Sequence, residues 1–335
     1  MCRRLCAELA TLTATVASAT WHTVTAAPLP SPPHVEARPV LEDRYPRSVV
    51  DFGQVEGFLD LVYSSPAGFR SLHLDLYRRK SVAVTSPLVV FVHGGGWESG
   101  HTRHAGAFAD WPAVLASLAA RGFVVASVEY RLSGEASFPA ALHDVMEALR
   151  WLRANAGSYR IERERTVIWG VSAGAQLAAL VAMSCGEAMP TGVNTDAGAC
   201  VQGLVAWYGV FDMASALAER SGTGSTSRAV SRYLGCVPEG CDRVAVTRAS
   251  PVAHVDEHDP PTLLIHGEQD EVVPATQSRR FHELLRAQRV TSTLTLLPGV
   301  GHSFIGANVE TTRVASLRAL EQSFDFITTT IGTQP

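Results

Sequence analysis

The sequence has no block of basic residues. Lys and Arg together number 28 against 32 Asp and Glu, so the formal net charge is −4. Binding to nucleic-acid phosphates needs clustered Lys and Arg side chains. This composition therefore argues against nucleic acid as the main partner.

Membrane-spanning runs and metal-type cysteine spacing are also missing. Beyond the N-terminal region no run is long and apolar enough to cross a bilayer, so we expect no stable membrane insertion. No repeated Cys-x-x-Cys motif indicates a zinc site. Hydrophobic residues make up 46% of the chain and charged residues 18%, which favours a large core over disorder.

The first 27 residues resemble a secretory signal peptide. Two arginines near the start precede a stretch of apolar and small residues, and small-residue cleavage sites follow. Glu8 and several threonines weaken the apolar stretch, and a disordered start is the alternative. Residues 28–53 are proline-rich and are predicted to be a linker. We therefore expect a secreted or periplasmic protein whose folded domain covers residues 54–335.

Four cysteines remain after the predicted signal peptide. An even number in an exported chain suggests disulfides, and four cysteines permit three pairings. Proximity in the sequence favours Cys185 with Cys200 and Cys236 with Cys241. Four unpaired buried thiols are the alternative.

Short β-rich runs alternate with helical runs along most of the chain. The strands are expected at Phe58–Tyr63, Leu72–Tyr77, Leu88–His93, Phe123–Glu129, Thr166–Trp169, Val201–Trp207, Thr262–His266 and Thr293–Leu297. The helices are expected at Ala105–Arg121, Pro139–Asn155, Ala173–Ser184, Ala275–Gln288 and Val309–Thr328. This alternation predicts a mostly parallel eight-stranded α/β sheet with helices on both faces.

The site of such a sheet lies beyond the carboxyl ends of its strands. The third expected strand, in "PLVVFVHGGG", is a continuous apolar run, as expected of a strand buried on both faces. Residues 213–261 are the least regular part, and we expect them to form a small insertion after the sixth strand, over the sheet edge.

Ser172 lies at the centre of a Gly-x-Ser-x-Gly motif, in "VIWGVSAGAQLA". An expected strand precedes it and an expected helix follows it. A turn this tight forces the central residue into strained backbone, and small neighbours are needed around it. The strain presents the hydroxyl at the strand end, beside the free N–H groups of a helix N-terminus. Ser172 is therefore the predicted nucleophile.

A nucleophilic serine needs a base and an orienting acid, which in this arrangement follow it in the order acid, then histidine. Asp270 lies just after one late strand, in "GEQDEVVP", and His302 lies just after the next, in "PGVGHSF". Both are therefore expected at the carboxyl end of the sheet. Glu268 and Glu271 are the competing acids, and we favour Asp270.

The tetrahedral intermediate of acyl transfer needs hydrogen-bond donors for its oxyanion. The glycines of "HGGGW" end the third expected strand, and they allow backbone N–H groups to approach a substrate oxygen. We predict an oxyanion hole formed by the N–H groups of Gly95, Gly96 and Ala173. A glycine-rich turn of purely structural purpose is the alternative.

His101 and His104 have the spacing of a metal-binding pair. No partner carboxylate or cysteine is obvious, so we expect no metal there. The predicted chemistry needs no organic cofactor either.

The chain resembles α/β-hydrolases of the esterase/lipase group. It is most similar to the BD-FAE-like branch of acetylxylan and feruloyl esterases, and it is related to hormone-sensitive-lipase-like esterases. The resemblance covers about residues 55 to 328 and depends on "VFVHGGGW", "VEYRLSGEASFPAALHDVMEALRWLRANA", "VIWGVSAGAQLAAL", "LLIHGEQDEVVP" and "PGVGHSF".

The resemblance implies a serine esterase with Ser172, Asp270 and His302 as its triad and an oxyanion hole shaped by "HGGGW". The segment Glu129–Leu132 together with Asp144 looks like the family's structural brace near the site. The favoured role of these residues is to stabilise the fold.

The chain departs from the hormone-sensitive-lipase-like pattern in two places. Val171 stands where an acidic residue usually precedes the nucleophile, and the N-terminal cap is short. A short cap suggests an open, shallow cleft, which favours polymeric or bulky esters over a single acyl chain held in a closed tunnel.

These observations predict a secreted carboxylesterase for acetyl, feruloyl or other short-acyl or polymeric esters. An arylformamidase-type amide hydrolase and a related peptidase are the alternatives within enzymes, and an inactive hydrolase-fold binding module is the alternative outside them. Trp97, Tyr208 and Phe211 are candidate substrate contacts, although aromatic residues at strand ends are as often part of the core.

Overall fold

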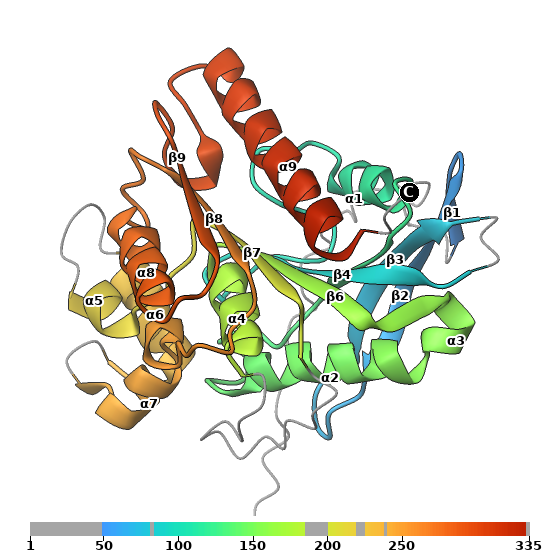
Figure 1. Cartoon of the computed structure of the whole chain (residues 1–335). Coiled ribbons are helices and arrows are strands. Elements are labelled where there is room, and N and C mark those ends of the chain that lie inside the picture. The colour runs from blue at the N-terminus through green and yellow to red at the C-terminus, as the bar shows by residue number, and fades with distance from the viewer. Residues whose placement is uncertain (1–48, 81–83, 185–199, 219–224, 238–239, 333–335) are drawn as a thin grey trace, which may run out of the picture. The chain divides into compact units, whose positions relative to one another are not determined.

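The computed structural model describes residues 49–80, 84–184, 200–218, 225–237 and 240–332. Its centre is a nine-stranded sheet in the order β1-β2-β3-β5-β4-β6-β7-β8-β9 (Figure 1). The strands are β1 Val49–Phe52, β2 Val55–Ser64, β3 Leu72–Arg79, β4 Ser86–Val92, β5 Val124–Val128, β6 Ile161–Val171, β7 Gly203–Trp207, β8 Thr262–Gly267 and β9 Ser292–Leu297.

The first strands are antiparallel and the remainder of the sheet is parallel. β1, β2, β3 and β5 pair antiparallel in turn. From β5 through β4, β6, β7 and β8 to β9 every pairing is parallel. All the carboxyl ends of these six strands therefore meet at one edge of the sheet, where the sequence predicts the site.

The sequence predicted eight strands, and the structure has one more. The additional strand, β1, lies inside residues 28–53, which were assigned to the linker. Its four residues pair with the start of β2 across a tight turn, in which Gly53 has a φ of 73°. The strand was missed because it is short and contains the charged Asp51, whose side chain accepts a hydrogen bond from the Gly53 N–H.

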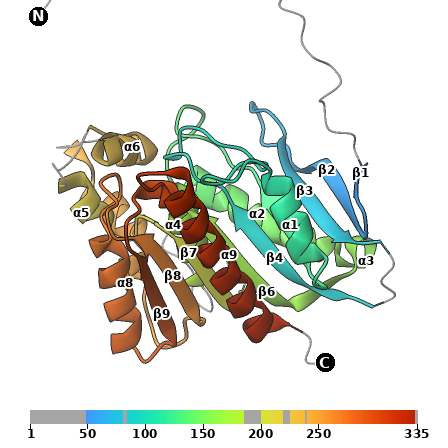
Figure 2. The ribbon, with the colours of Figure 1, turned by 90° about the horizontal axis from the view of Figure 1, so that it is seen from above.

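Helices cover both faces of the sheet. α1 (Trp111–Ala119) and α9 (Val309–Ile331) lie on one face, and α2 (Ala140–Ala154), α4 (Ala173–Ala182) and α8 (Thr276–Ala287) lie on the other (Figure 2). In β4, Leu88 and Val90 pack toward α2 and α4, whereas Val89 packs toward α1 and α9. Both faces of this central strand are buried, as its continuous apolar sequence predicts.

The segment between β7 and β8 is more helical than its sequence suggested. It forms α5 (Met213–Ala218), α6 (Ser225–Leu234), α7 (Arg243–Arg248) and a short 3₁₀ helix, Pro251–Ala253. α6 is not confined to the sheet edge, because Tyr233 stacks on Trp97 in the loop after the central strand β4, with ring centroids 4.6 Å apart.

A disulfide joins Cys236 and Cys241 within this insertion. Cys185 lies outside the described residues, so its pairing with Cys200 stays a prediction. None of the helices in the described ranges is both apolar enough and long enough to cross a membrane.

Candidate active site

Ser172 occupies a sharp turn between strand β6 and helix α4. The strand ends at Val171 and the helix begins at Ala173, so a single residue makes the turn. Its backbone has φ 52° and ψ −122°, a combination that is strained for any residue with a side chain. The Ser172 N–H donates to the carbonyl oxygen of Trp207 at 2.9 Å, which ties the turn to β7.

The two glycines of the motif are required by close backbone packing. A Cβ on Gly174 would lie 2.2 Å from the carbonyl oxygens of Val92 and His93 at the end of β4. A Cβ on Gly170 would lie 2.3 Å from the carbonyl oxygen of Gly174. The turn therefore fits against β4 only because both positions lack side chains.

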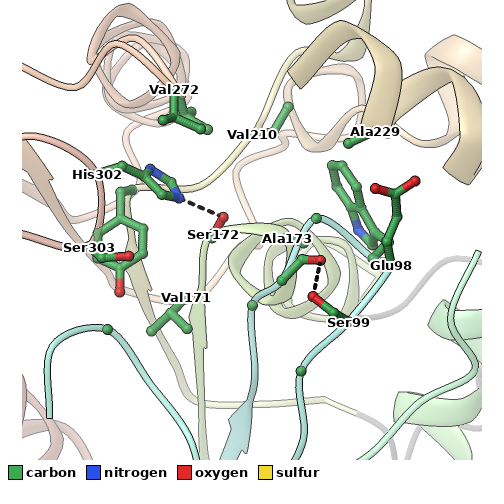
Figure 3. A pocket seen from close by; sticks show the side chains of 18 of the residues that line it. Glu98, Ser99, Val171, Ser172, Ala173, Val210, Ala229, Val272, His302 and Ser303 are labelled. Atoms are coloured by element: carbon green, nitrogen blue, oxygen red, sulfur yellow. Dashed lines mark hydrogen bonds between the residues drawn. The ribbon is translucent and has the colours of Figure 1, made fainter. Parts of the chain in front are cut away.

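Three side chains from three loops form one line of hydrogen bonds. The Ser172 Oγ lies 3.0 Å from Nε2 of His302 (Figure 3). Nδ1 of the same ring lies 2.8 Å from Oδ2 of Asp270. Ser172 follows β6, Asp270 follows β8, and His302 follows β9 in a short 3₁₀ helix, His302–Phe304. Asp270, rather than Glu268 or Glu271, is the carboxylate bonded to the histidine.

Asp270 is held as a buried, ionised carboxylate. Its Oδ1 accepts the N–H groups of Val272 at 2.9 Å and Val273 at 2.8 Å. Burial alone would raise the pKa of Asp270, but hydrogen bonds from His266 and His302, the charge of His302 and the Val273 N–H lower it well below its ordinary range. The side chain can therefore orient His302 and stabilise its protonated form.

Three backbone N–H groups lie free around Ser172, on Gly95, Gly96 and Ala173. Within the described part of the chain none of them donates a hydrogen bond. Ala173 is the first residue of α4, where the helix leaves its N–H groups unsatisfied. Free donors in this position can bind an oxyanion.

The loop that carries Gly95 and Gly96 is supported by contacts at the end of β4. The buried His93 ring stacks on Tyr130 with centroids 4.3 Å apart, and the Tyr130 hydroxyl donates to the His93 carbonyl oxygen at 3.0 Å. Arg131 and Asp144, from the segment predicted to be a brace, form a salt bridge of 2.7 Å. The brace thus contacts the strand end from which the glycine loop departs.

A cavity of about 590 Å³ opens above Ser172. Val210, Ala229 and Val272 lie on one side of the serine and form an apolar wall (Figure 3). Ser99 and Ser303 lie on the other side in the same view. The exposed His101 and His104 also line the cavity, so its rim is polar and reaches solvent.

Of the three aromatic residues predicted to contact substrate, two line the cavity and one does not. Tyr208 lines the cavity and packs against His302, with ring centroids 4.8 Å apart. Trp97 also lines it, although its ring is almost wholly buried and its Nε1 donates to Gln176 at 3.0 Å. The prediction for Phe211 is wrong, because this ring is buried in the core against Phe281 and does not reach the cavity.

The structure gives no support for a metal at His101 and His104. Their ring centroids are 6.2 Å apart. Across the described ranges, no group of three or more His, Cys, Asp or Glu side chains is arranged to hold an ion.

Sequence reasoning missed one residue next to the triad. His266, at the end of β8, is fully buried, and its Nε2 lies 3.3 Å from Oδ2 of Asp270. The available signal was a histidine ending an apolar strand, four residues before the acid, in "LLIHGEQD".

Comparison with known proteins identifies the family of the chain. A family model described as BD-FAE matches residues 74–285. The chain belongs to the BD-FAE family. Two curated relatives of this BD-FAE chain come from Mycobacterium tuberculosis. Esterase LipC is 34% identical over 69% of this chain and 56% of the relative, and Esterase LipQ is 31% identical over 76% and 59%. The chain thus spans somewhat over half the length of these relatives.

A solved structure extends the similarity to most of the BD-FAE chain. It is described as a truncated form of a carbohydrate esterase from gut microbiota. It covers 83% of this chain and 96% of its own, with a TM-score of 0.66 and 25% identity. The α/β-hydrolase fold predicted from the sequence is therefore confirmed.

Proposed function

We propose that the protein hydrolyses carboxylic esters through an acyl-enzyme formed on Ser172. The observation that carries this proposal is the unbroken hydrogen-bond line from Ser172 through His302 to Asp270. The free N–H groups beside the serine and the esterase names of the relatives support it.

Each group has one role in the proposed reaction. His302 Nε2 takes the hydroxyl proton as Ser172 Oγ attacks the ester carbonyl carbon, and the N–H groups of Gly95, Gly96 and Ala173 stabilise the oxyanion. His302 then gives its proton to the leaving alcohol. Water repeats the cycle on the acyl-enzyme and restores the serine. Asp270 holds the tautomer of His302 throughout, and the cycle uses no metal or organic cofactor.

The cavity favours a short acyl group and a bulky alcohol. The apolar wall of Val210, Ala229 and Val272 suits a short acyl chain, whereas the open polar rim leaves room for a large hydroxylated alcohol. The similarity to a carbohydrate esterase supports acylated polysaccharides as substrates. Acetyl or feruloyl esters of plant polysaccharide, and other short-acyl or polymeric esters, are therefore the proposed substrate class.

Replacing Ser172 by Ala tests the nucleophile. The variant should fold normally and lose at least about a thousandfold in kcat/KM on p-nitrophenyl acetate, because no hydroxyl remains to be acylated. Ser117→Ala, at an exposed serine on α1, should keep wild-type activity. A Ser172→Ala protein with near-wild-type activity would remove the assignment.

A substrate panel separates ester hydrolysis from its alternatives. Acetylated xylan, methyl ferulate and p-nitrophenyl esters should be hydrolysed in preference to N-formylkynurenine and dipeptide anilides. Preference for the formyl amide would indicate an arylformamidase, and preference for the anilides would indicate a peptidase. A protein that no fluorophosphonate labels would be an inactive binding module.

We also propose that the protein is exported. The signal-like N-terminal sequence and the Cys236–Cys241 disulfide support this location, because disulfides persist in oxidising compartments.

A further inference from the structure

We propose that His266 is a positioning residue of the triad. His266 shares the Asp270 carboxylate with His302 and thereby sets the pH range in which His302 acts as a base. This inference rests on the proposed function, since it assigns a role beside the same three side chains.

His266 is in direct contact with the triad acid. It lies at the carboxyl end of β8, and none of its surface is exposed. Its Nε2 is 2.8 Å from the carbonyl oxygen of Val273 and 3.3 Å from Oδ2 of Asp270. The same Oδ2 accepts the hydrogen bond from Nδ1 of His302.

The partners of His266 fix its tautomer. The Val273 carbonyl and the ionised Asp270 can only accept hydrogen bonds, so Nε2 must carry a proton that both share. On the other side of the ring, the Ser278 hydroxyl of α8 lies 2.7 Å from Nδ1 and can donate to it. The ring is therefore held at both ends, with its N–H bonded to the Val273 carbonyl oxygen and 3.3 Å from Oδ2 of the triad acid.

This N–H withdraws negative charge from the oxygen that faces His302. The Asp270 carboxylate is surrounded by four donors, two backbone N–H groups on Oδ1 and two imidazoles at Oδ2. Without His266 more negative charge would remain at Oδ2, which would favour protonated His302. Protonated His302 cannot accept the Ser172 proton, so the enzyme would need a higher pH to work.

The other titratable or charged groups near Asp270 and His302 pack on the His302 ring, face solvent or pair with another residue. The Tyr208 ring packs on His302. Glu268 and Glu271, on the Asp270 loop, are exposed to solvent. Arg280, on the adjacent helix α8, pairs with Asp212 at 2.6 Å.

Two His266 variants and one control test the proposal. His266→Phe removes the N–H, whereas His266→Gln keeps a donor near the Nε2 position. His282→Phe is the matched control, because His282 on α8 also bonds a serine hydroxyl, Ser292 at 2.9 Å, but does not contact the triad. The readout is the rate of fluorophosphonate labelling of Ser172 as a function of pH, with thermal unfolding measured alongside.

We expect the acid limb of the His266→Phe labelling profile to move to higher pH by about half a unit or more. His266→Gln and His282→Phe should keep the wild-type acid limb. A folded His266→Phe protein with a wild-type acid limb would overturn the proposal, as would an equal shift in His282→Phe.

Histidine ¹⁵N spectra of the wild-type enzyme test the same proposal if His266→Phe does not fold. His266 should be the Nε2–H tautomer, and its signals should shift with the midpoint at which His302 titrates. An Nδ1–H tautomer, or signals insensitive to that titration, would contradict the inference. Failure of the proposed function is seen separately, as a wild-type enzyme that is not labelled at any pH.

Discussion

At the residue scale, the histidine that begins the glycine loop shows how burial and charge are coupled. His93 is almost wholly buried between β4 and Tyr130, and its Nδ1 lies 2.7 Å from the carbonyl oxygen of Gly94. Burial lowers the pKa of His93 to about 4, because the protonated ring loses its water. Between about pH 6.5 and about pH 4, the folded protein therefore contains a neutral His93 where an unfolded chain would be protonated.

This difference makes the stability of the protein depend on pH. Between about pH 6.5 and about pH 4 the unfolded chain binds a proton at His93 and the folded chain does not, so the free energy of unfolding falls as the pH falls. The shift corresponds to about 3 kcal/mol. His93→Asn should therefore lose about 3 kcal/mol less than the wild type between pH 7.5 and pH 4 in urea unfolding. Equal losses in the two proteins would contradict the prediction.

Individual site residues differ in how well the sequence predicts them. Ser172, Asp270 and His302 each lie in the segment that follows a strand, so local patterns place them at one edge of the sheet. The signal at His266 is weaker, because this residue is the fifth of an apolar strand and its contact with Asp270 depends on how the following loop turns back. Phe211 was predicted to contact substrate because it is an aromatic residue near a strand end, but its ring points into the core.

At the element scale, α6 is the helix that the sequence predicted least well. It lies in residues 213–261, which were expected to be the least regular part of the chain. The helix is stabilised by long-range contacts, such as Arg232 with Glu98 at 2.6 Å and Tyr233 on Trp97. Such contacts join segments more than a hundred residues apart, and no local pattern indicates them. α6 thereby brings Ala229 to the apolar wall of the cavity.

Enlarging Ala229 tests whether α6 limits the acyl chain. Ala229→Phe should reduce kcat/KM for p-nitrophenyl hexanoate at least about tenfold more than for the acetate, because the added ring occupies space beside the serine. Val244→Phe, at an exposed position on α7 of the same insertion, should leave the ratio of the two rates unchanged. If both variants keep the wild-type ratio, the apolar wall does not hold the acyl group.

At the scale of the whole molecule, one parallel sheet explains why distant segments share a site. Loops after β4, β6, β7, β8 and β9 supply the glycine loop, Ser172, Tyr208, Asp270 and His302 respectively. The alternation of strands and helices predicted this convergence. It did not predict the strand order, in which β5 lies between β3 and β4, because pairing depends on the path of each crossover.

The proposed export depends on the N-terminal sequence, which makes it testable. Expressed in a bacterial host with a secretory pathway, the protein should leave the cytoplasm and lose its first residues. Cleavage at the small-residue sites, after Ala19, Ala26 or Ala27, predicts a new N-terminus at Thr20, Ala27 or Pro28, which intact-mass spectrometry would identify. A chain lacking residues 2–27 should stay in the cytoplasm. An uncleaved full-length protein found only in the cytoplasm would contradict export. It would not bear on the proposed active site, which labelling of Ser172 tests separately.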